Sequence, residues 1–163
     1  VEALRKGEEP DLEDPVHRGI EIELHVPALI PESYIADVQT RLTLYKRIAS
    51  AKDPGGLREL QVEMIDRFGL LPDAIKALFE VAELRLVAER IGIIKLDFGP
   101  NGGRVEFSEQ TRANPAALIQ LIQERSFDFQ MRGPDKLRIT MQEEDPAERF
   151  REVRELLERL EVK

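Results

Sequence analysis

Hydrophobic residues between positions 36 and 71 recur at the spacing of two amphipathic helices, each with one buried face. The apolar positions of the first helix and its approach are Ile35, Val38, Leu42, Tyr45 and Ile48. Those of the second are Leu57, Leu60, Met64, Ile65 and Phe68. The sequence Asp53-Pro54-Gly55-Gly56 separates the two helices, and Gly69 and Pro72 end the second, because proline and glycine interrupt helical structure.

The second of these helices has a polar side that the predicted core does not need. Because successive residues advance by about 100° around a helix, four charged residues fall on the arc opposite the apolar stripe: Glu59, Glu63, Asp66 and Arg67. This arc carries both signs of charge, and an arginine fork can bind a carboxylate through two hydrogen bonds. We therefore expect a docking site for a partner here. The alternative interpretation is an ordinary solvated helix face.

The remaining hydrophobic patterns complete the order of elements. Apolar and polar residues alternate from Ile20 to Val26, which predicts a half-buried strand. Downstream, the patterns predict a helix over 72–92, a hairpin over 94–107, a helix after Asn114, a hairpin over 127–141 and a helix after Asp145. Hairpins favour antiparallel pairing, and strands grouped apart from helices favour an α+β fold with an antiparallel sheet covered by helices.

The first residues of the chain have a different composition from the rest. Residues 1–18 are rich in Asp and Glu and contain Pro10 and Pro15, a pattern typical of a linker. We therefore expect an acidic linker over 1–18, joined to something upstream, and one folded domain over 19–163. A disordered tail is the alternative for the first segment.

The charge balance restricts the class of partner. The chain has 32 Asp and Glu residues against 24 Lys and Arg, a formal net charge of -8. Because neutralisation of phosphates dominates affinity for nucleic acids, this balance argues against direct binding of DNA or RNA. No apolar run has the roughly 20 residues of a membrane helix, and the absence of cysteine fits a cytoplasmic protein.

Motifs that carry chemistry are absent from the sequence. His17 and His25 are its two histidines and do not have the spacing of metal ligands. The sequence has no cysteine and no histidine in a recognisable catalytic pattern, so it lacks the usual components of a nucleophile–base triad. Asp53-Pro54-Gly55-Gly56 precedes a helix but lacks the phosphate-binding pattern of nucleotide hydrolases. The sequence thus predicts an interaction domain without a metal or cofactor.

Three segments of the sequence resemble the C-terminal domain of bacterial transcription-repair coupling factors. They are VPALIPESYIADVQTRLTLYKRIASA at 26–51, VEMIDRFGLLPD at 62–73 and AELRLVAERIGIIKLD at 82–97. The resemblance extends from about residue 14 to the end of the chain. It implies that residues 1–18 connect this domain to an upstream translocase motor.

This resemblance also implies a function. The parent protein of the family is an ATP-dependent DNA translocase that displaces stalled RNA polymerase and recruits the excision-repair protein UvrA. ATP and Mg²⁺ belong to its motor, so RNA polymerase, UvrA and DNA are indirect partners of this domain. The domain is expected to pack on the UvrB-like N-terminal module of the same protein, mask the UvrA-binding surface and restrain the motor.

Residues of the predicted polar arc match the contact that the family makes with this module, namely Glu63, Asp66 and Arg67. Two other functions stay open at this point. The domain could act as an adaptor for a separate repair or transcription protein, or it could be a small enzyme of an unrecognised kind.

Overall fold

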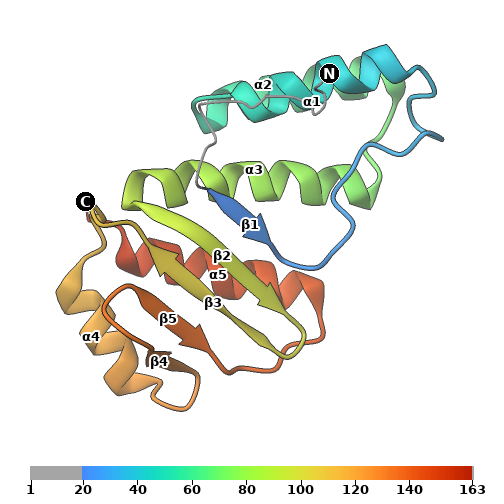
Figure 1. Cartoon of the computed structure of the whole chain (residues 1–163). Helices are drawn as coiled ribbons and strands as arrows, with labels where there is room; N and C mark the ends of the chain where they lie inside the picture. The colour runs from blue at the N-terminus through green and yellow to red at the C-terminus, as the bar shows by residue number, and fades with distance from the viewer. Residues whose placement is uncertain (1–19, 163) are drawn as a thin grey trace, which may run out of the picture.

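The computed structural model describes residues 20–162, so the linker expected over 1–18 lies outside the described residues. Within this range, five strands form one sheet in the order β1-β2-β3-β5-β4 (Figure 1). Their bounds are β1 (Glu21–Glu23), β2 (Ile93–Gly99), β3 (Gly102–Phe107), β4 (Phe129–Met131) and β5 (Lys136–Ile139). The helices in the same range are α1 (Val38–Ser50), α2 (Pro54–Phe68), α3 (Asp73–Ile91), α4 (Pro115–Glu124) and α5 (Pro146–Leu160).

This order confirms the α+β fold expected from the sequence, with one strand, three helices, and then two hairpins that are each followed by a helix. One pairing differs from a purely antiparallel sheet. The strands β2, β3, β5 and β4 pair antiparallel, whereas β1 pairs parallel with β2. Three helices separate β1 from β2, and so long a connection does not impose the antiparallel direction that a hairpin turn does.

Helix starts follow from short polar side chains placed before proline. Asp53, Asn114 and Asp145 each accept hydrogen bonds from backbone N–H groups in the first turn of α2, α4 and α5. Proline follows each of these caps, where its missing N–H has no helical partner to lose. These local signals explain why the sequence located the helix boundaries well.

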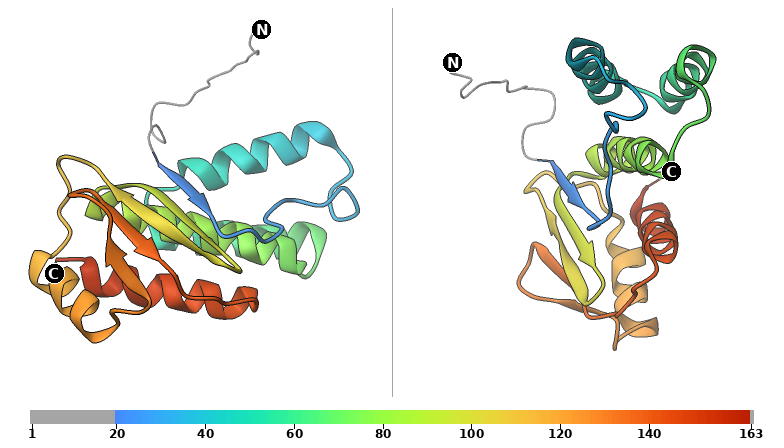
Figure 2. Two further views of the ribbon diagram at one scale, coloured as in Figure 1. Left: turned by 60° about the horizontal axis from the view of Figure 1, so that its bottom comes forward. Right: turned by 90° about the vertical axis from the view of Figure 1, so that its right-hand side faces the viewer.

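Two hydrophobic clusters share α3. The first fills the space between the sheet and α3, α4 and α5, with Leu96, Val105 and Leu137 among its fully buried members. The second joins α1 and α2 to the first half of α3, around Leu57 and Met64. Figures 1 and 2 accordingly show α1 and α2 on the side of α3 that faces away from the sheet.

Several apolar positions lie elsewhere than the sequence pattern predicted. Val38 and Leu42 are 55% and 49% exposed, and α1 instead buries Leu44 and Ile48. The spacing of Val38 and Leu42 is as helical as that of Leu44 and Ile48, so the pattern did not decide which side packs. The aromatic ring of Phe127 is also exposed, because β4 begins only at Phe129.

The predicted alternation in β2 is shifted by one residue at its start. A bulge between Ile93 and Lys95 turns Ile93 into the core and leaves Ile94 partly exposed. In α5, Arg151 contacts Glu155, one turn further along the helix, at 2.9 Å. Arg159 is also four residues from Glu155, but it contacts Glu124 of α4 at 3.1 Å.

Candidate interdomain docking site

The predicted docking residues all lie on α2, whose start is fixed by a strong local cap. The carboxylate of Asp53 accepts a hydrogen bond from the N–H of Gly56 at 2.8 Å, and Pro54 occupies the first helical position. At the other end, Gly69 has a φ of 101°, a backbone conformation that favours glycine and ends the helix.

A buried face anchors α2 to the rest of the molecule. Leu57, Leu60 and Met64 are at most 4% exposed and pack in the cluster shared with α1 and α3. The hydroxyl of Tyr34 donates to the carbonyl oxygen of Gly69 at 2.6 Å, which ties the end of α2 to the segment before α1. Burial raises the pKa of Tyr34 above its ordinary value, so this hydroxyl keeps its proton at neutral pH.

The carboxylate of Glu63 lies between the two helices of the α1–α2 hairpin. Both of its oxygens accept hydrogen bonds from the guanidinium of Arg47 in α1, each at 2.8 Å. Arg67, one turn further along α2, contacts the same carboxylate at 3.2 Å. The bonds from Arg47, followed by the weaker contact with Arg67, lower the pKa of Glu63 from its ordinary 4.5 to about 2.

The side chain of Arg67 has a second contact within α2. Its guanidinium lies 4.7 Å from the centre of the Phe68 ring, within the range of a cation–π interaction. Together, Arg47, Glu63 and Arg67 form a bridge that joins α1 to α2, which we call the Arg47–Glu63 clasp. Two of the four predicted docking residues thus help to hold the hairpin together.

The outermost surface of α2 contains the other two predicted residues and two that the sequence analysis missed. Glu59 and Asp66 are exposed, and Val62 lies between them on the helix with 59% of its surface exposed. Ile65, predicted to belong to the buried stripe, is 39% exposed beside them. We call these four residues, Glu59, Val62, Ile65 and Asp66, the α2 outer face.

The spacing of residues in the sequence already indicates that Val62 is exposed. It follows Glu59 by three residues and precedes Asp66 by four, so it must share their side of the helix. An apolar residue inside a polar arc is predicted to be exposed, because it shares the orientation of its polar neighbours. The position of Ile65 could not be decided in the same way, since it lies at the border between the two faces.

Two properties of the described residues bear on other kinds of function. Between residues 20 and 162, no three His, Cys, Asp or Glu side chains gather as they would around a metal ion. In the same range, every helix is too short or too polar to cross a membrane.

Comparison with known proteins identifies the family. The TRCF domain family matches residues 24–118. The transcription-repair-coupling factors of Escherichia coli (strain K12) and Haemophilus influenzae are 44% and 45% identical over 99% and 96% of this chain. The chain spans only 14% of the length of either relative.

A solved structure of the C-terminal domain of a transcription-repair coupling factor has the same fold. It superimposes with a TM-score of 0.65, covers 84% of this chain and 94% of its own, and shares 22% sequence identity. The resemblance inferred from the three sequence segments is confirmed. By the extent of these matches, this chain belongs to the TRCF domain family of transcription-repair coupling factors.

Proposed function

We propose that this chain is a non-catalytic regulatory domain that docks on the UvrB-like N-terminal module of its own longer protein. Docking masks the UvrA-binding surface of that module and restrains an ATP-dependent DNA translocase, which displaces stalled RNA polymerase in the cytoplasm. ATP and Mg²⁺ are bound by the motor, and this domain binds no cofactor. The names of the relatives and the resemblance of Glu63, Asp66 and Arg67 to the contact residues of the family support the proposal.

The single observation that carries the proposal is the composition of the α2 outer face. Two exposed apolar side chains, Val62 and Ile65, lie beside the carboxylates of Glu59 and Asp66. Protein interfaces commonly have an apolar centre that excludes water and a charged rim that selects the partner and fixes register. The α2 outer face combines these two features on one side of one helix.

The Arg47–Glu63 clasp prepares this surface for docking. Because Glu63 is bound by Arg47 of α1, the two helices present their outer sides as one rigid unit. The domain then loses little conformational freedom when a partner binds α2, and this favours binding at a given area of contact. Glu63 therefore has two roles, as a residue of the expected contact and as the residue that positions α2 against α1. Asp66 and Val62 contact the partner without a part in the clasp.

A latch of this kind needs only weak intrinsic affinity. When two modules belong to one chain, the linker supplies an effective concentration that reaches the millimolar range for short linkers. Exposed charge pairs contribute about 1 kcal/mol or less each, so the mask opens when another partner competes for the module.

The test uses the full-length coupling factor that contains this domain, with Val62→Glu and Asp66→Lys as separate variants. Both substitutions are on the α2 outer face and leave the clasp intact. We expect each to increase UvrA binding about five- to tenfold and to raise the basal rate of ATP hydrolysis, since each removes about 1 kcal/mol of docking energy. Glu109→Lys, at an exposed site after β3, is the matched control and should change neither quantity.

Unchanged UvrA binding and ATP hydrolysis in both variants would contradict the proposal. If binding to a separate repair or transcription protein were lost instead, the same face would belong to a trans-acting adaptor.

A further inference from the structure

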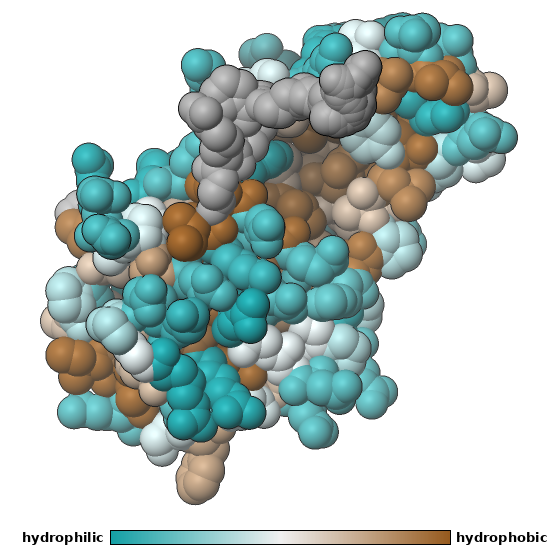
Figure 3. All heavy atoms as spheres, viewed as in Figure 1, coloured by the Kyte–Doolittle hydropathy of each residue, from teal (hydrophilic) through white to brown (hydrophobic). Residues whose placement is uncertain are grey.

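Among residues 20–162, helices cover one face of the sheet and leave the other face open, and a row of charged residues crosses this open face (Figure 2). Across the strands, cross-strand neighbours form a row that starts with Glu23 and Asp97 and continues with Arg104 and Arg138. In this row, carboxylates lie on the β1 side and guanidinium groups on the β5 side. The neighbouring row of the same face alternates in sign, with Glu21, Lys95, Glu106 and Lys136. Figure 3, which views this face, shows mainly hydrophilic residues over the sheet.

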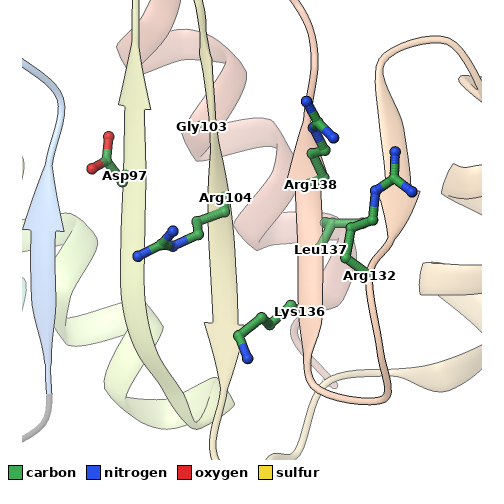
Figure 4. A pocket seen from close by; sticks show the side chains of 7 residues that line it. All are labelled: Asp97, Gly103, Arg104, Arg132, Lys136, Leu137 and Arg138. Atoms are coloured by element: carbon green, nitrogen blue, oxygen red, sulfur yellow. The ribbon is translucent and has the colours of Figure 1, made fainter.

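A hollow of about 430 Å³ lies in the basic half of this face. Its charged lining consists of Arg104 from β3, Lys136 and Arg138 from β5, Arg132 from the β4–β5 turn, and Asp97 at its border with β2 (Figure 4). Four cations around one hollow are unexpected in a chain with a net charge of -8.

The acidic neighbours of the hollow already have partners. Asp97 accepts a hydrogen bond from the ring Nε2 of His25 at 2.8 Å, and Glu106 contacts Arg104 at 2.9 Å. Asp135 lies 4.0 Å from the ammonium group of Lys136. Among the ion pairs between residues 20 and 162, none includes Arg132 or Arg138. The basic side of the hollow therefore has more cationic groups than the described part of the chain neutralises.

We propose that this hollow, which we call the sheet-face basic hollow, binds an acidic peptide segment in an extended conformation. The segment has carboxylates at alternate positions, in the pattern Asp/Glu-x-Asp/Glu. This surface is separate from the α2 outer face, and the proposal does not depend on the docking function proposed above.

The spacing of the cations carries the choice of an extended peptide. Lys136 and Arg138 are two residues apart on β5, so their side chains leave the sheet about 7 Å apart. Alternate side chains of an extended peptide have the same repeat, which lets two successive carboxylates face the two cations. Arg104 leaves the adjacent strand opposite Arg138, about 5 Å to the side. Its guanidinium extends toward β2 and contacts Glu106 (Figure 4).

Two carboxylates at the edge of the hollow restrict where an acidic ligand can lie. Asp97 and Glu23 lie beyond Arg104 on the same row, where a further acidic residue of the ligand would be repelled. Glu106, the neighbour of Lys136 on β3, adds a further carboxylate on this side of β5. The peptide is therefore held along β5 and is kept away from β1. These carboxylates also limit the width of the basic zone to about two strands.

The same features argue against a nucleic acid as the ligand. A phosphate backbone needs several cations in a long track, whereas this zone is narrow and its far side is acidic. Bases of a single strand stack on exposed aromatic rings, but the rings of the sheet, Phe98, Phe107 and Phe129, are at most 5% exposed on the opposite face.

The experiment measures binding of a fluorescein-labelled peptide in which glutamate alternates with threonine, by fluorescence anisotropy with the whole chain. We expect saturable binding that weakens as sodium chloride is raised, because the contacts are ionic. The double variant Arg132→Glu/Arg138→Glu should bind at least about tenfold more weakly. Lys46→Glu/Lys52→Glu changes the net charge equally at exposed sites near the other end of the molecule and should bind like the wild type.

Two further probes test the chemistry of the ligand. A peptide of the same composition with its glutamates in one block should bind several-fold more weakly, since its carboxylates do not match the repeat of β5. A thymidine oligonucleotide of equal charge should compete poorly. Circular dichroism at several temperatures checks that the variants remain folded.

Three outcomes would overturn the proposal. They are the absence of wild-type binding, equal losses in the two double variants, and tighter binding of the oligonucleotide than of the alternating peptide. The first two would show that the hollow is not a specific site, and the third would identify it as a nucleic-acid surface.

Discussion

At the scale of single residues, the most unusual side chain is the buried guanidinium of Arg149 in α5. It is 2% exposed and donates hydrogen bonds to the carbonyl oxygens of Glu143, Leu24 and His25, at 2.7, 3.1 and 3.4 Å. These bonds attach the last helix to the chain just after β1. His25 lies there with a φ of 60°, a conformation that needs such support in a residue other than glycine.

Replacement of this arginine tests how much the attachment stabilises the fold. Arg149→Met keeps most of the side-chain volume but leaves the three carbonyl groups without their donor, so we expect a loss of about 2–4 kcal/mol in the free energy of unfolding. Urea denaturation measures it. Arg154 lies on the same helix and forms an exposed pair with Glu80 of α3, so Arg154→Met should cost about 1 kcal/mol or less. Equal effects of the two substitutions would exclude a special role for the buried group.

A second residue-scale prediction concerns the pH dependence of the Arg47–Glu63 clasp. The pKa of Glu63 falls from 4.5 to about 2 on folding, mainly through its hydrogen bonds with Arg47. A carboxyl whose pKa is lower in the folded state stabilises the protein above its unfolded pKa, and this contribution is lost as pH falls toward the folded value. The urea midpoint of wild type should therefore exceed that of Glu63→Gln at pH 7, and the difference should shrink between about pH 4.5 and pH 2.

The control for this titration is Glu59→Gln, an exposed carboxyl on the same helix. The urea midpoint of Glu59→Gln should differ little from that of wild type over the same pH range. High salt should also reduce the effect of Glu63→Gln, because the clasp is exposed to solvent. A difference that does not change with pH would show that the clasp does not act through the charge of Glu63.

At the scale of elements, two glycines have opposite roles, and the structure gives the reason. A Cβ atom at Gly103 would overlap the carbonyl oxygen of Asp97 on the neighbouring strand, so the β2–β3 pairing at this point requires glycine. Gly56, in the first turn of α2, would meet nothing closer than an oxygen of Asp53 at 3.8 Å. Only the first is needed for packing.

The same substitution should thus have opposite effects at the two positions. Gly103→Ala should destabilise the protein by about 3 kcal/mol or more, because one of two paired strands must move. Gly56→Ala should stabilise it by about 0.5–1 kcal/mol, since alanine loses less backbone entropy in a helix. Thermal unfolding of both variants gives the two signs, and a shift in the same direction for both would contradict this assignment.

At the scale of the whole molecule, α3 is the element that both hydrophobic clusters share. Its first half, with Ile75 and Phe79, packs against α1 and α2, and its second half, with Ala88 and Ile91, packs against the sheet. The α2 outer face and the sheet-face basic hollow are therefore supported by different hydrophobic clusters. Two binding surfaces can act independently on such a scaffold.

Hydrogen exchange should reveal this division. We expect amides of α1 and α2 to exchange through a partial opening with a lower free energy than that of β2, β3 and β5. Among residues 20–162, the helical hairpin packs only against α3 and the segment before α1. Leu57→Ala, which costs about 2–5 kcal/mol, should reduce protection in α1 and α2 more than in the sheet. Leu137→Ala, equally buried in the other cluster, is the matched variant and should reduce protection mainly in the strands. Uniform loss of protection in both would indicate a single cooperative unit.

The sequence by itself determined the order and type of the elements, and the physical reason is that their signals are local. Caps such as Asp53 and Asn114, the breaks at proline and glycine, and the two hairpin turns each act within a few residues. The polar arc of α2 could be predicted in the same way, because one helix and its period define it. Its proposed partner came from the family resemblance.

Only the tertiary structure decided which groups meet across elements. Val38 and Leu44 offer equally helical stripes, and packing against α3 selected the second. The parallel β1–β2 pairing, the bond between Arg47 and Glu63 and the hollow between Arg104 and Arg138 all join residues that are distant in sequence. No local pattern encodes such contacts, because they depend on how whole elements are placed against one another.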